Sequence, residues 1–347
     1  MRTTPTLVAL APVLALTLAV AIAPQATRGQ TVHHLPATPS TVAWGYYWSE
    51  APPVLRIASG DMVEVETMIT SRPNRLEQIG VSPDQVQQSL RDIVEQVTDR
   101  GPGGHILTGP IYVEEAEPGD VIEVRILTID LPIPYGYNGC SGFMRQLCPE
   151  QRTRVFWLDR ERMVSQFAPG IVIPLRPFFG SIGVAPPVDA GRWSSVPPWI
   201  HAGNLDNREL VAGTSLFIPV HVPGALLALG DGHAAQGDGE VDQTAIETSL
   251  TGLIQVVVHK DMTLEWPLGE TPTHYITMGT DEDLTRATEI AIEQTVKFLS
   301  TRFELDPGEA YRLISVAADL RITELVDQKV GVHVMIPKSI FVGPTGG

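Results

Sequence analysis

The sequence predicts an α+β fold that is mainly β, with a β-sandwich- or barrel-like part over residues 30–196 and an α+β part over residues 197–347. The chain has 31 glycines and 29 prolines in 347 residues, which favours turn-rich β structure over a helical bundle. Strand patterns dominate up to residue 130, whereas the C-terminal part combines helical patterns with strands.

The first 29 residues have the pattern of a secretory signal peptide. Leu7 to Ala23 is almost wholly apolar, follows Arg2, and precedes small residues with possible cleavage sites after Ala23 or Gly29. No other stretch approaches the ~20 apolar residues of a transmembrane helix, and a retained N-terminal anchor is the alternative. We therefore expect export to the periplasm or the extracellular space, no membrane contact after cleavage, and one domain over residues 30–347.

Two segments of the N-terminal part begin with a Gly-Asp turn and continue as strands. Met62–Glu66 and Val121–Arg125 each alternate charged side chains with valine or isoleucine, which predicts half-buried strands of an antiparallel sandwich or barrel. Between them, a capping box with proline at the first helical position predicts a helix that begins at Ser82 and ends near Gly101.

The rest of the chain is predicted as loops and short strands, followed by strands and helices. Residues 131–196 are rich in proline and glycine, and long irregular segments of this kind are often functional. Strands are expected over residues 210–230 with a break near Pro223, and over residues 249–259, 273–278 and 330–336. Helices are expected to begin at Thr280 and Asp306.

Charge and cysteine content narrow the environment and the partners. The formal net charge is −16 and no block of lysine or arginine occurs, so nucleic acid and anionic lipid are poor partners. The two cysteines, Cys140 and Cys148, lie in a Gly/Pro-rich stretch. In an exported protein they predict a local disulfide, with a catalytic thiol as the alternative.

Two glycine-flanked clusters of acid, amide and histidine side chains are the candidate site. They are separated by apolar strands that can return the chain and bring both clusters to one end of a sheet. The members are His201, Asn204 and Asp206 in the first cluster, and Asp231, His233, Gln236, Asp238 and Glu240 in the second. Three or four such ligands from two loops suit metal-activated water, whereas an ordinary surface turn is the alternative for residues 231–240.

The predicted ligands are His201, Asp206, Asp231 and His233. Histidine with aspartate favours zinc, and the oxygen-rich, glycine-rich loop leaves calcium open. Glu240 is then the candidate general base.

Further residues are assigned to substrate contacts. Asn204 and Gln236 could hold a carbonyl oxygen or an amide nitrogen, although Asn204 could also simply cap a turn. Phe179 and the backbone of Gly180-Ser181 are expected to shape a small pocket, and Gly180-Ser181-Ile182-Gly183 is not the G-x-S-x-G motif of serine hydrolases. His105 follows two glycines and is either a pocket residue or a surface histidine.

Five groups of motifs follow one another along the chain: Pro53 to Asp61, Leu107 to Val113 with Glu117 to Asp120, Phe178 to Pro186, His201 to Asp206, and Gly230 to Glu240. Through these motifs the chain resembles the acetamidase/formamidase family from about His33 to Phe341. The resemblance implies a sheet-rich fold, a homo-oligomer, and a divalent metal near the H-x-G-N-x-D and G-D-x-H segments. The family motifs correspond here to His201, Asn204, Asp206, Asp231, His233 and Glu240.

The function that this resemblance implies is hydrolysis of a short aliphatic amide, such as formamide or acetamide, to carboxylate and ammonia. We therefore expect an exported, metal-assisted amidase. One alternative is an exported binding protein on the same scaffold that holds a small molecule or a metal without catalysis. The other is a hydrolase of a different bond, either an ester or another carbon–nitrogen bond such as that of a cyclic amide.

Overall fold

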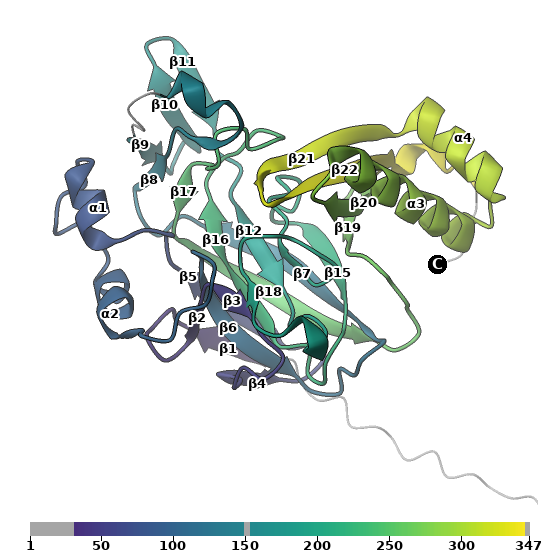
Figure 1. The fold of residues 1–347 in the computed structure, drawn as a ribbon, viewed down its shortest axis with the longest axis horizontal. Coiled ribbons are helices and arrows are strands. Elements are labelled where there is room, and N and C mark those ends of the chain that lie inside the picture. Colours follow the sequence, from purple (N-terminus) through teal and green to yellow (C-terminus); the bar gives the residue numbers. More distant parts are fainter. Residues whose placement is uncertain (1–30, 149–152, 344–347) are drawn as a thin grey trace, which may run out of the picture. The chain divides into compact units, whose positions relative to one another are not determined.

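Two large β-sheets pack against each other in the computed structural model of the chain, which describes residues 31–148 and 153–343 (Figure 1). The mainly β, α+β fold predicted from the sequence is confirmed. The predicted signal peptide, residues 1–29, lies outside the described residues. Among the residues described, no helix combines the length and the apolar character needed to span a membrane.

The first sheet has nine strands within the described residues. Their order across the sheet is β1 (Val32–Leu35), β5 (Met62–Thr67), β18 (Leu250–His259), β7 (Val121–Asp130), β15 (Thr214–Pro219), β19 (Leu268–Glu270), β20 (His274–Asp281), β22 (Lys329–Pro337) and β21 (Asp319–Asp327). The two strands that follow Gly-Asp turns, β5 and β7, both pair antiparallel with β18, which lies between them. Both therefore belong to one sheet, as predicted.

The second sheet has eleven strands in the described part of the chain. Eight form a row: β11 (Ile171–Pro174), β10 (Val164–Ala168), β9 (Arg154–Asp159), β8 (Tyr135–Asn138), β17 (Glu247–Thr248), β16 (Leu227–His233), β12 (Phe178–Gly183) and β14 (Ala202–Asn204). The other three are β6 (Ile106–Val113), which also pairs with β16, and its neighbours β2 (Val42–Trp44) and β4 (Leu55–Ile57). Two short strands, β3 (Tyr46–Tyr47) and β13 (Trp193–Ser194), pair separately.

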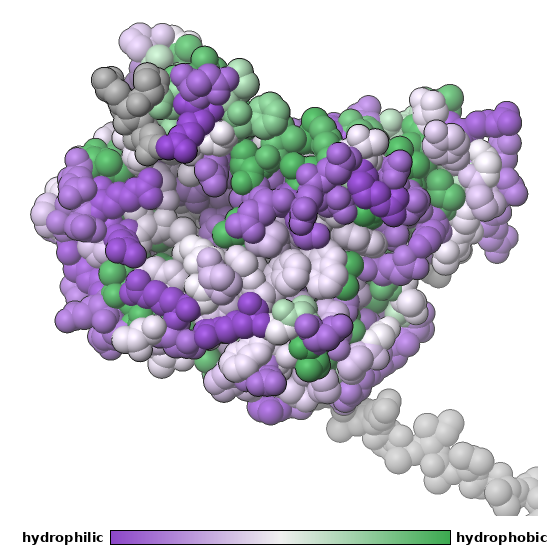
Figure 2. All heavy atoms as spheres, viewed as in Figure 1, coloured by the Kyte–Doolittle hydropathy of each residue, from purple (hydrophilic) through white to green (hydrophobic). Residues whose placement is uncertain are grey.

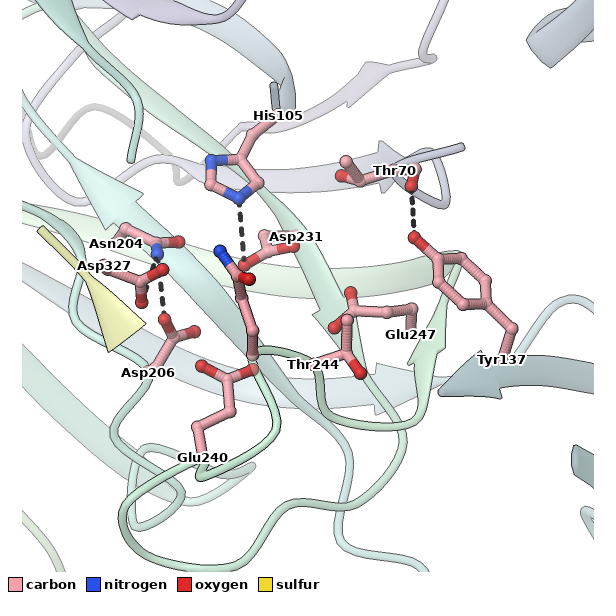
Figure 3. Close-up of a pocket in the computed structure, with 11 residues that line it drawn as sticks. Thr70, His105, Tyr137, Asn204, Asp206, Asp231, Glu240, Thr244, Glu247 and Asp327 are labelled. Carbon is pink, nitrogen blue, oxygen red and sulfur yellow. Dashed lines mark hydrogen bonds and ion pairs between the residues drawn. The ribbon is translucent and has the colours of Figure 1, made fainter. Parts of the chain in front are cut away.

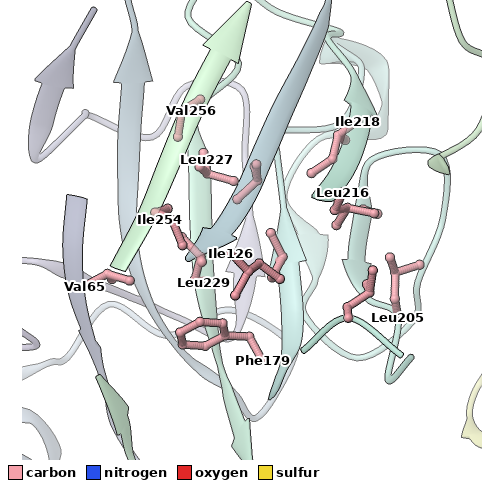
Figure 4. Close-up of a cluster of buried hydrophobic side chains, with 14 of the residues drawn as sticks. Val65, Ile126, Phe179, Leu205, Leu216, Ile218, Leu227, Leu229, Ile254 and Val256 are labelled. Carbon is pink, nitrogen blue, oxygen red and sulfur yellow. The ribbon is translucent and has the colours of Figure 1, made fainter. Parts of the chain in front are cut away.

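The main hydrophobic core lies between the two sheets (Figure 4). Val65 and Ile254 project into it from the first sheet, and Phe179 and Leu229 project from the second. Such alternation of inward apolar residues along facing strands is what a packed β-sandwich requires. Phe179, predicted at the pocket, is a core residue here, with only 1% of its surface exposed.

Two C-terminal helices cover one end of the first sheet. Helix α3 (Leu284–Phe303) and helix α4 (Pro307–Ala317) pack with β22 in one hydrophobic cluster. The strand β20 runs on to Asp281, so the helix begins at the N-cap Asp283 and not at Thr280, as the sequence analysis expected. Gly279 allows this, because a Cβ atom there would lie 2.5 Å from the backbone nitrogen of Ala291 in α3.

Two short helices belong to the N-terminal part. They are α1 (Pro73–Gln78) and α2 (Gln88–Gln96). The sequence predicts that the second helix begins at Ser82, but residues 83–86 form a turn and α2 begins at Gln88. The carbonyl oxygen of Gln85 accepts a hydrogen bond from the hydroxyl of Tyr135, and this tertiary contact competes with the helical bond. Three 3-10 helices complete the described part of the chain: η1 (Gly142–Leu147), η2 (Val188–Ala190) and η3 (Lys338–Ile340).

The face of the molecule shown in Figure 2 is mainly polar, with apolar residues gathered towards its upper edge. Exposed apolar side chains on β9–β11 are Trp157, Phe167, Ile171 and Val172. Exposed apolar side chains on η1 are Phe143, Met144 and Leu147. Strands β9–β11 and η1 therefore carry seven of the large exposed apolar side chains of the described residues.

Candidate active site

Five acidic side chains line one pocket of about 110 Å³ (Figure 3). They are Asp206, Asp231, Glu240, Glu247 and Asp327. The other residues that line it are Thr70, His105, Tyr137, Asn204, Gln243 and Thr244. Among the residues described, no lysine, arginine or aliphatic side chain contributes to this wall. The pocket is therefore strongly acidic and polar.

Strand β12 brings the two predicted clusters together. It pairs with β14 on one side and with β16 on the other, so that Ser181 lies opposite both Asn204 and Gly230. Asp206 follows β14, Asp231 and His233 lie at the end of β16, and Glu240 lies in the loop after β16. Residues that are far apart in the sequence thus meet around β12 in the second sheet.

Gly180 leaves the space in which these side chains converge. A Cβ atom at Gly180 would lie 2.5 Å from Asp206 Oδ1, 2.7 Å from Asp231 Oδ2 and 2.7 Å from His233 Cε1. Contacts this short do not occur, so even an alanine would displace at least one of the three groups. The glycine was assigned to the pocket from the sequence, and the structure gives the steric reason why a glycine is needed.

Three of the five acids have a left-handed backbone conformation. The φ angles of Asp206, Asp231 and Glu240 are 47°, 54° and 40°. Residues other than glycine adopt this region at a cost of about 1 kcal/mol or more, and they cluster at functional sites. The fold therefore holds these carboxylates in positions that local conformational preference alone would not select.

Gln236 fixes the hydrogen on the His233 ring. Its Nε2 donates to the backbone carbonyl of Asp206 at 2.8 Å, so its Oε1 must face His233 Nδ1, also at 2.8 Å. Nδ1 therefore carries the hydrogen, which leaves the lone pair of Nε2 facing Asp231 Oδ2 at 3.3 Å and Glu247 Oε2 at 3.4 Å. This nitrogen has no hydrogen-bond partner. Its lone pair and the two carboxylates repel one another, and only a proton or a metal cation between them removes that repulsion.

Asn204 joins two of the acids. Its Nδ2 donates to Asp206 Oδ2 at 2.8 Å and to Asp327 Oδ2 at 3.1 Å, and its Oδ1 accepts from the hydroxyl of Ser181 at 2.6 Å. Both hydrogens of its amide group are therefore already used. Ser181, predicted to contact substrate, instead uses its hydroxyl to hold Asn204 in place.

Asp327 comes from the hairpin between β21 and β22, far from the two sequence clusters. The carboxyl group of Glu324 accepts from the backbone nitrogens of Val326 at 2.9 Å and Asp327 at 3.2 Å, which holds the turn. The same strand pairs with the loop that carries Glu240, because Gly239 bonds to the backbone of residues 323 and 325. The C-terminal hairpin thus positions one acid directly and a second through its loop.

The crowding of acids raises the pKa of most of them. Burial, followed by repulsion from neighbouring carboxylates, raises the pKa of Asp206 and of Glu240 well above the usual values. Burial also raises the pKa of Glu247, and it raises that of Asp327 to about 6. Negative charge is therefore disfavoured at these four acids, and the pocket wall formed by the described residues contains no lysine or arginine that would stabilise it.

Attraction between histidines and carboxylates shifts the pKa of His233 and of Asp231 against the effect of burial. Burial on its own would lower the pKa of His233, but the carboxylates of Glu247 and Asp231 raise it well above its usual value. Burial on its own would raise the pKa of Asp231, but His105 and His233 hold it well below the usual range. Positive charge is therefore stabilised at the ring of His233.

Two groups of side chains could each hold a metal ion. Within each group the ligand atoms lie within 4.8 Å of one another: Asp206, His233 and Glu240 form one group, and Asp231, His233 and Glu247 form the other. Asp206 Oδ1 and His233 Nε2 are both buried without a hydrogen-bond partner. Carboxylate and imidazole donors together suit zinc and related divalent ions, so the residues present fit a divalent cation.

The structure does not bring His201 into either group. Its ring is fully buried, with the Tyr47 ring 5.0 Å and the Trp193 ring 6.1 Å away edge-on, and the backbone of Gly203 covers Nε2. Burial lowers its pKa to about 3. His105, by contrast, lines the pocket, with Nδ1 3.0 Å from the carbonyl oxygen of Ser195 and Nε2 3.8 Å from Asp231 Oδ2.

Cys140 and Cys148 form a disulfide that closes a loop beside the pocket. Backbone nitrogens of the loop, from Ser141 and Phe143, donate to the carbonyl oxygens of residues 242 and 241. Gly139 donates to the hydroxyl of Thr244, which lines the pocket. The disulfide loop therefore lies against the segment that directly follows Glu240.

The sequence analysis missed two of the five acids, Glu247 and Asp327. Each looks in the sequence like an ordinary charged residue at the end of a short strand. Their only distinctive property is burial, with 5% and 7% of their surfaces exposed, and burial follows from contacts with distant strands.

Comparison with known proteins places the chain in a family. Residues 41–193 and 188–342 match the Acetamidase/Formamidase family. Over 200 residues the chain is 28% identical to an acetamidase from Mycolicibacterium smegmatis, an alignment that covers 40% of this chain and 49% of that relative. The chain spans about half the length of the curated relatives it matches.

Solved structures extend the likeness along the chain. An acetamidase from Yersinia enterocolitica superposes with a TM-score of 0.77 at 29% identity, covering 91% of this chain and 94% of that one. An acetamidase from Bacillus halodurans gives a TM-score of 0.75 at 30% identity, covering 90% of this chain and 100% of that one. The motifs in the sequence, the family match and the shared fold agree, and the chain belongs to the acetamidase/formamidase family.

Proposed function

We propose that the protein hydrolyses the amide bond of a short aliphatic amide, of the formamide or acetamide kind, to a carboxylate and ammonia with the help of a divalent metal ion. The observation that carries the proposal is the set of buried carboxylates that surrounds His233 and lines the adjacent pocket. Relatives named acetamidase and formamidase support the choice of bond.

The group formed by Asp231, His233 and Glu247 is the proposed metal site. Gln236 supports this choice, because it orients His233 so that the bare Nε2 faces the other two members of the group. Zinc is the first candidate for this donor set, and calcium is the second. When bound, such an ion supplies positive charge that acidifies water and polarises a carbonyl oxygen.

Glu240 is the proposed general base. Its carboxylate takes a proton from the attacking water as the water oxygen bonds to the amide carbon. It returns that proton to the nitrogen as the carbon–nitrogen bond breaks and ammonia leaves. Burial, with nearby Asp327, raises the pKa of Glu240, which brings it closer to the range in which a carboxylate can both accept and return a proton near neutral pH.

Asn204 and His105 have supporting roles in this proposal. Because both amide hydrogens of Asn204 go to Asp206 and Asp327, we assign it to holding those acids in place and not to the substrate. His105 keeps its Nδ1 hydrogen on the carbonyl oxygen of Ser195, so its Nε2 is the atom that faces the pocket and the substrate.

We further propose that the mature protein is exported and forms a homo-oligomer, on the basis of the apolar N-terminal stretch and of the family resemblance. Two other functions make different predictions. An exported binding protein on the same scaffold would bind the ligand or the metal without releasing ammonia. A hydrolase of esters would release acid without ammonia.

The test is ammonia release by purified mature protein from formamide, acetamide and propionamide. It is measured with the protein as isolated, after chelation, and after single metals are added back. Release that is lost on chelation and restored by one metal supports both the amidase and the metal. Ammonia release that is insensitive to chelation supports the amidase function and contradicts the role of the metal. No release from folded, metal-loaded protein contradicts the whole proposal.

A further inference from the structure

The pocket is small and opens to solvent. A buried cavity of about 150 Å³ can hold one benzene molecule, and this pocket measures about 110 Å³. The part of a substrate that enters it therefore has about four or five non-hydrogen atoms. Formamide, acetamide, propionamide and glycinamide can all enter whole, so size does not choose among them.

The wall of the pocket is mainly polar, and among the described residues it contains no aliphatic side chain that would favour an alkyl group. Among the described residues, every side chain that lines it is an acid, an amide, a hydroxyl group or an imidazole. The walls beside Glu247 are the hydroxyl-bearing residues Thr70, Tyr137 and Thr244 (Figure 3). An alkyl chain that enters would remove water from these groups without replacing its hydrogen bonds, which is unfavourable.

The charge of the pocket is not balanced by the proposed metal. A divalent ion held by Asp231 and Glu247 would compensate the charges of those two acids. Asp206, Glu240 and Asp327 would still face the pocket, and the described wall contains no lysine or arginine. Positive charge in the substrate would therefore be stabilised there, and negative charge would be rejected.

Asp327 is the acid that remains available to bind such a charge. It belongs to neither group of potential metal ligands, and it is not the proposed base. Asn204 holds its Oδ2 at 3.1 Å, which fixes the carboxylate at the pocket wall. The turn bonds to Glu324 fix its backbone, so a cationic group would meet an acid that is already oriented.

We propose that the pocket selects small amides whose acyl part carries an ammonium group or other hydrogen-bond donors, the class of amino-acid amides with glycinamide as its smallest member, over alkyl amides of equal size. Asp327 binds the ammonium group in this proposal, while the chemistry at the amide carbon is unchanged. The proposal rests on the proposed amidase function and adds the substrate class to it.

Glycinamide and propionamide are the decisive pair of substrates, because they have the same number of non-hydrogen atoms and differ in an ammonium group against a methyl group. The comparison uses the holoprotein at pH 6.5 and constant ionic strength, where an α-amino group with a pKa of about 8 is protonated. Since a hydrogen bond to a charged group is worth about tenfold or more, we expect kcat/KM for glycinamide to exceed that for propionamide by at least tenfold.

The variant Asp327→Asn tests the assigned residue. The ratio of kcat/KM for glycinamide to that for propionamide should fall at least tenfold, because the carboxylate charge is removed while the side-chain shape is kept. The matched control is Asp319→Asn on the same strand, where the acid is exposed and outside the pocket, and there the ratio should not change. Thermal shifts with glycinamide and with propionamide give a second, binding-only readout.

The outcomes separate this inference from the function on which it rests. Hydrolysis of propionamide as fast as or faster than glycinamide overturns the inference and leaves the amidase standing. An unchanged ratio in folded Asp327→Asn overturns the role of that residue. No hydrolysis of any amide, including formamide and acetamide, overturns the amidase function. The comparison of the two substrates on the unaltered protein remains decisive if Asp327→Asn fails to fold.

Discussion

Replacing Gly180 by alanine should disrupt the site without a large loss of fold stability. The added Cβ atom would lie 2.5 Å from Asp206 Oδ1, and ordinary contact begins at 3.4 Å, so the oxygen must retreat by about 0.9 Å. Asp231 Oδ2 and His233 Cε1, at 2.7 Å, must each retreat by about 0.7 Å. Gly180 has no left-handed φ angle, so alanine adds no backbone strain.

The size of the effect follows from these displacements. Functional groups must be held within about 0.5 Å of their working positions, and a misplacement of about 1 Å costs on the order of 10²-fold in rate. We therefore expect Gly180→Ala to lower both metal affinity and ammonia release by about 10²-fold. Crowding of a packed region costs about 1–3 kcal/mol, so the variant should still fold.

The measurements are metal affinity by titration calorimetry, ammonia release, and the free energy of unfolding in urea. The matched control is Gly252→Ala, because its Cβ atom would lie 2.6 Å from the Phe179 ring in the core, away from the acids. This control should lose comparable stability and keep its metal affinity. Wild-type metal affinity and rate in Gly180→Ala would refute the convergence of the site on this glycine.

Three further predictions concern the base, the pH dependence and the disulfide. Glu240→Gln should reduce ammonia release by about 10²–10⁴-fold with its thermal midpoint retained, and near-normal release would remove Glu240 from its role. Burial lowers the pKa of His333 in the folded protein to about 3. As the pH falls below about 6.5, this histidine is therefore protonated in the unfolded chain before it is protonated in the folded protein. His333 alone should therefore remove about 1.4 kcal/mol of stability per pH unit as the pH falls towards 3. Between pH 7 and pH 5 in urea, the wild-type protein should lose more stability, or gain less, than His333→Gln, and an equal pH dependence in both proteins would count against this. Reduction of the disulfide between Cys140 and Cys148 should lower the free energy of unfolding by about 2–3 kcal/mol and raise KM for the amide. The variant with both cysteines replaced by serine should not respond to reductant. A wild-type protein that does not respond to reductant would contradict the contact between this loop and the pocket.

Local patterns were sufficient to predict seven of the strands, namely β5, β7, β15, β16, β18, β20 and β22. The Gly-Asp turns before β5 and β7 and the break between β15 and β16 are short-range signals, and the structure agrees with them. The helix that begins at Pro307, with Asp306 as its N-cap, was predicted in the same way. Alternation and capping depend on neighbours in the chain, so one sequence is enough to detect them.

The errors in the fold came from contacts that no local pattern contains. The expected helix start at Ser82 was wrong, because the hydroxyl of Tyr135 takes the carbonyl group of Gln85. The expected cap at Thr280 was wrong, because Gly279 lets the strand continue against a helix. In both cases tertiary packing overrode a valid capping signal.

The residues of the candidate site likewise divide into those that local patterns reveal and those that only tertiary contacts bring to the pocket. Asp206, Asp231, His233 and Glu240 could be assembled from the sequence because each lies beside glycines in a recognisable cluster. Glu247 and Asp327 could not, since each reaches the pocket only through pairing between strands far apart in the sequence. The roles of all these residues, the metal, export and the homo-oligomer stay predictions.

The C-terminal hairpin makes the pocket depend on nearly the whole length of the chain. Thr70 is the first residue in the sequence that lines the pocket, and Asp327 is the last. Strand β21 also holds the loop of Glu240 through backbone hydrogen bonds with Gly239. A chain that ends before β21 therefore has four of the five acids, but it lacks Asp327 and the strand that arranges Glu240. Under the proposed function, such a truncated chain should be inert towards amides even when it contains every residue of the two glycine-flanked clusters.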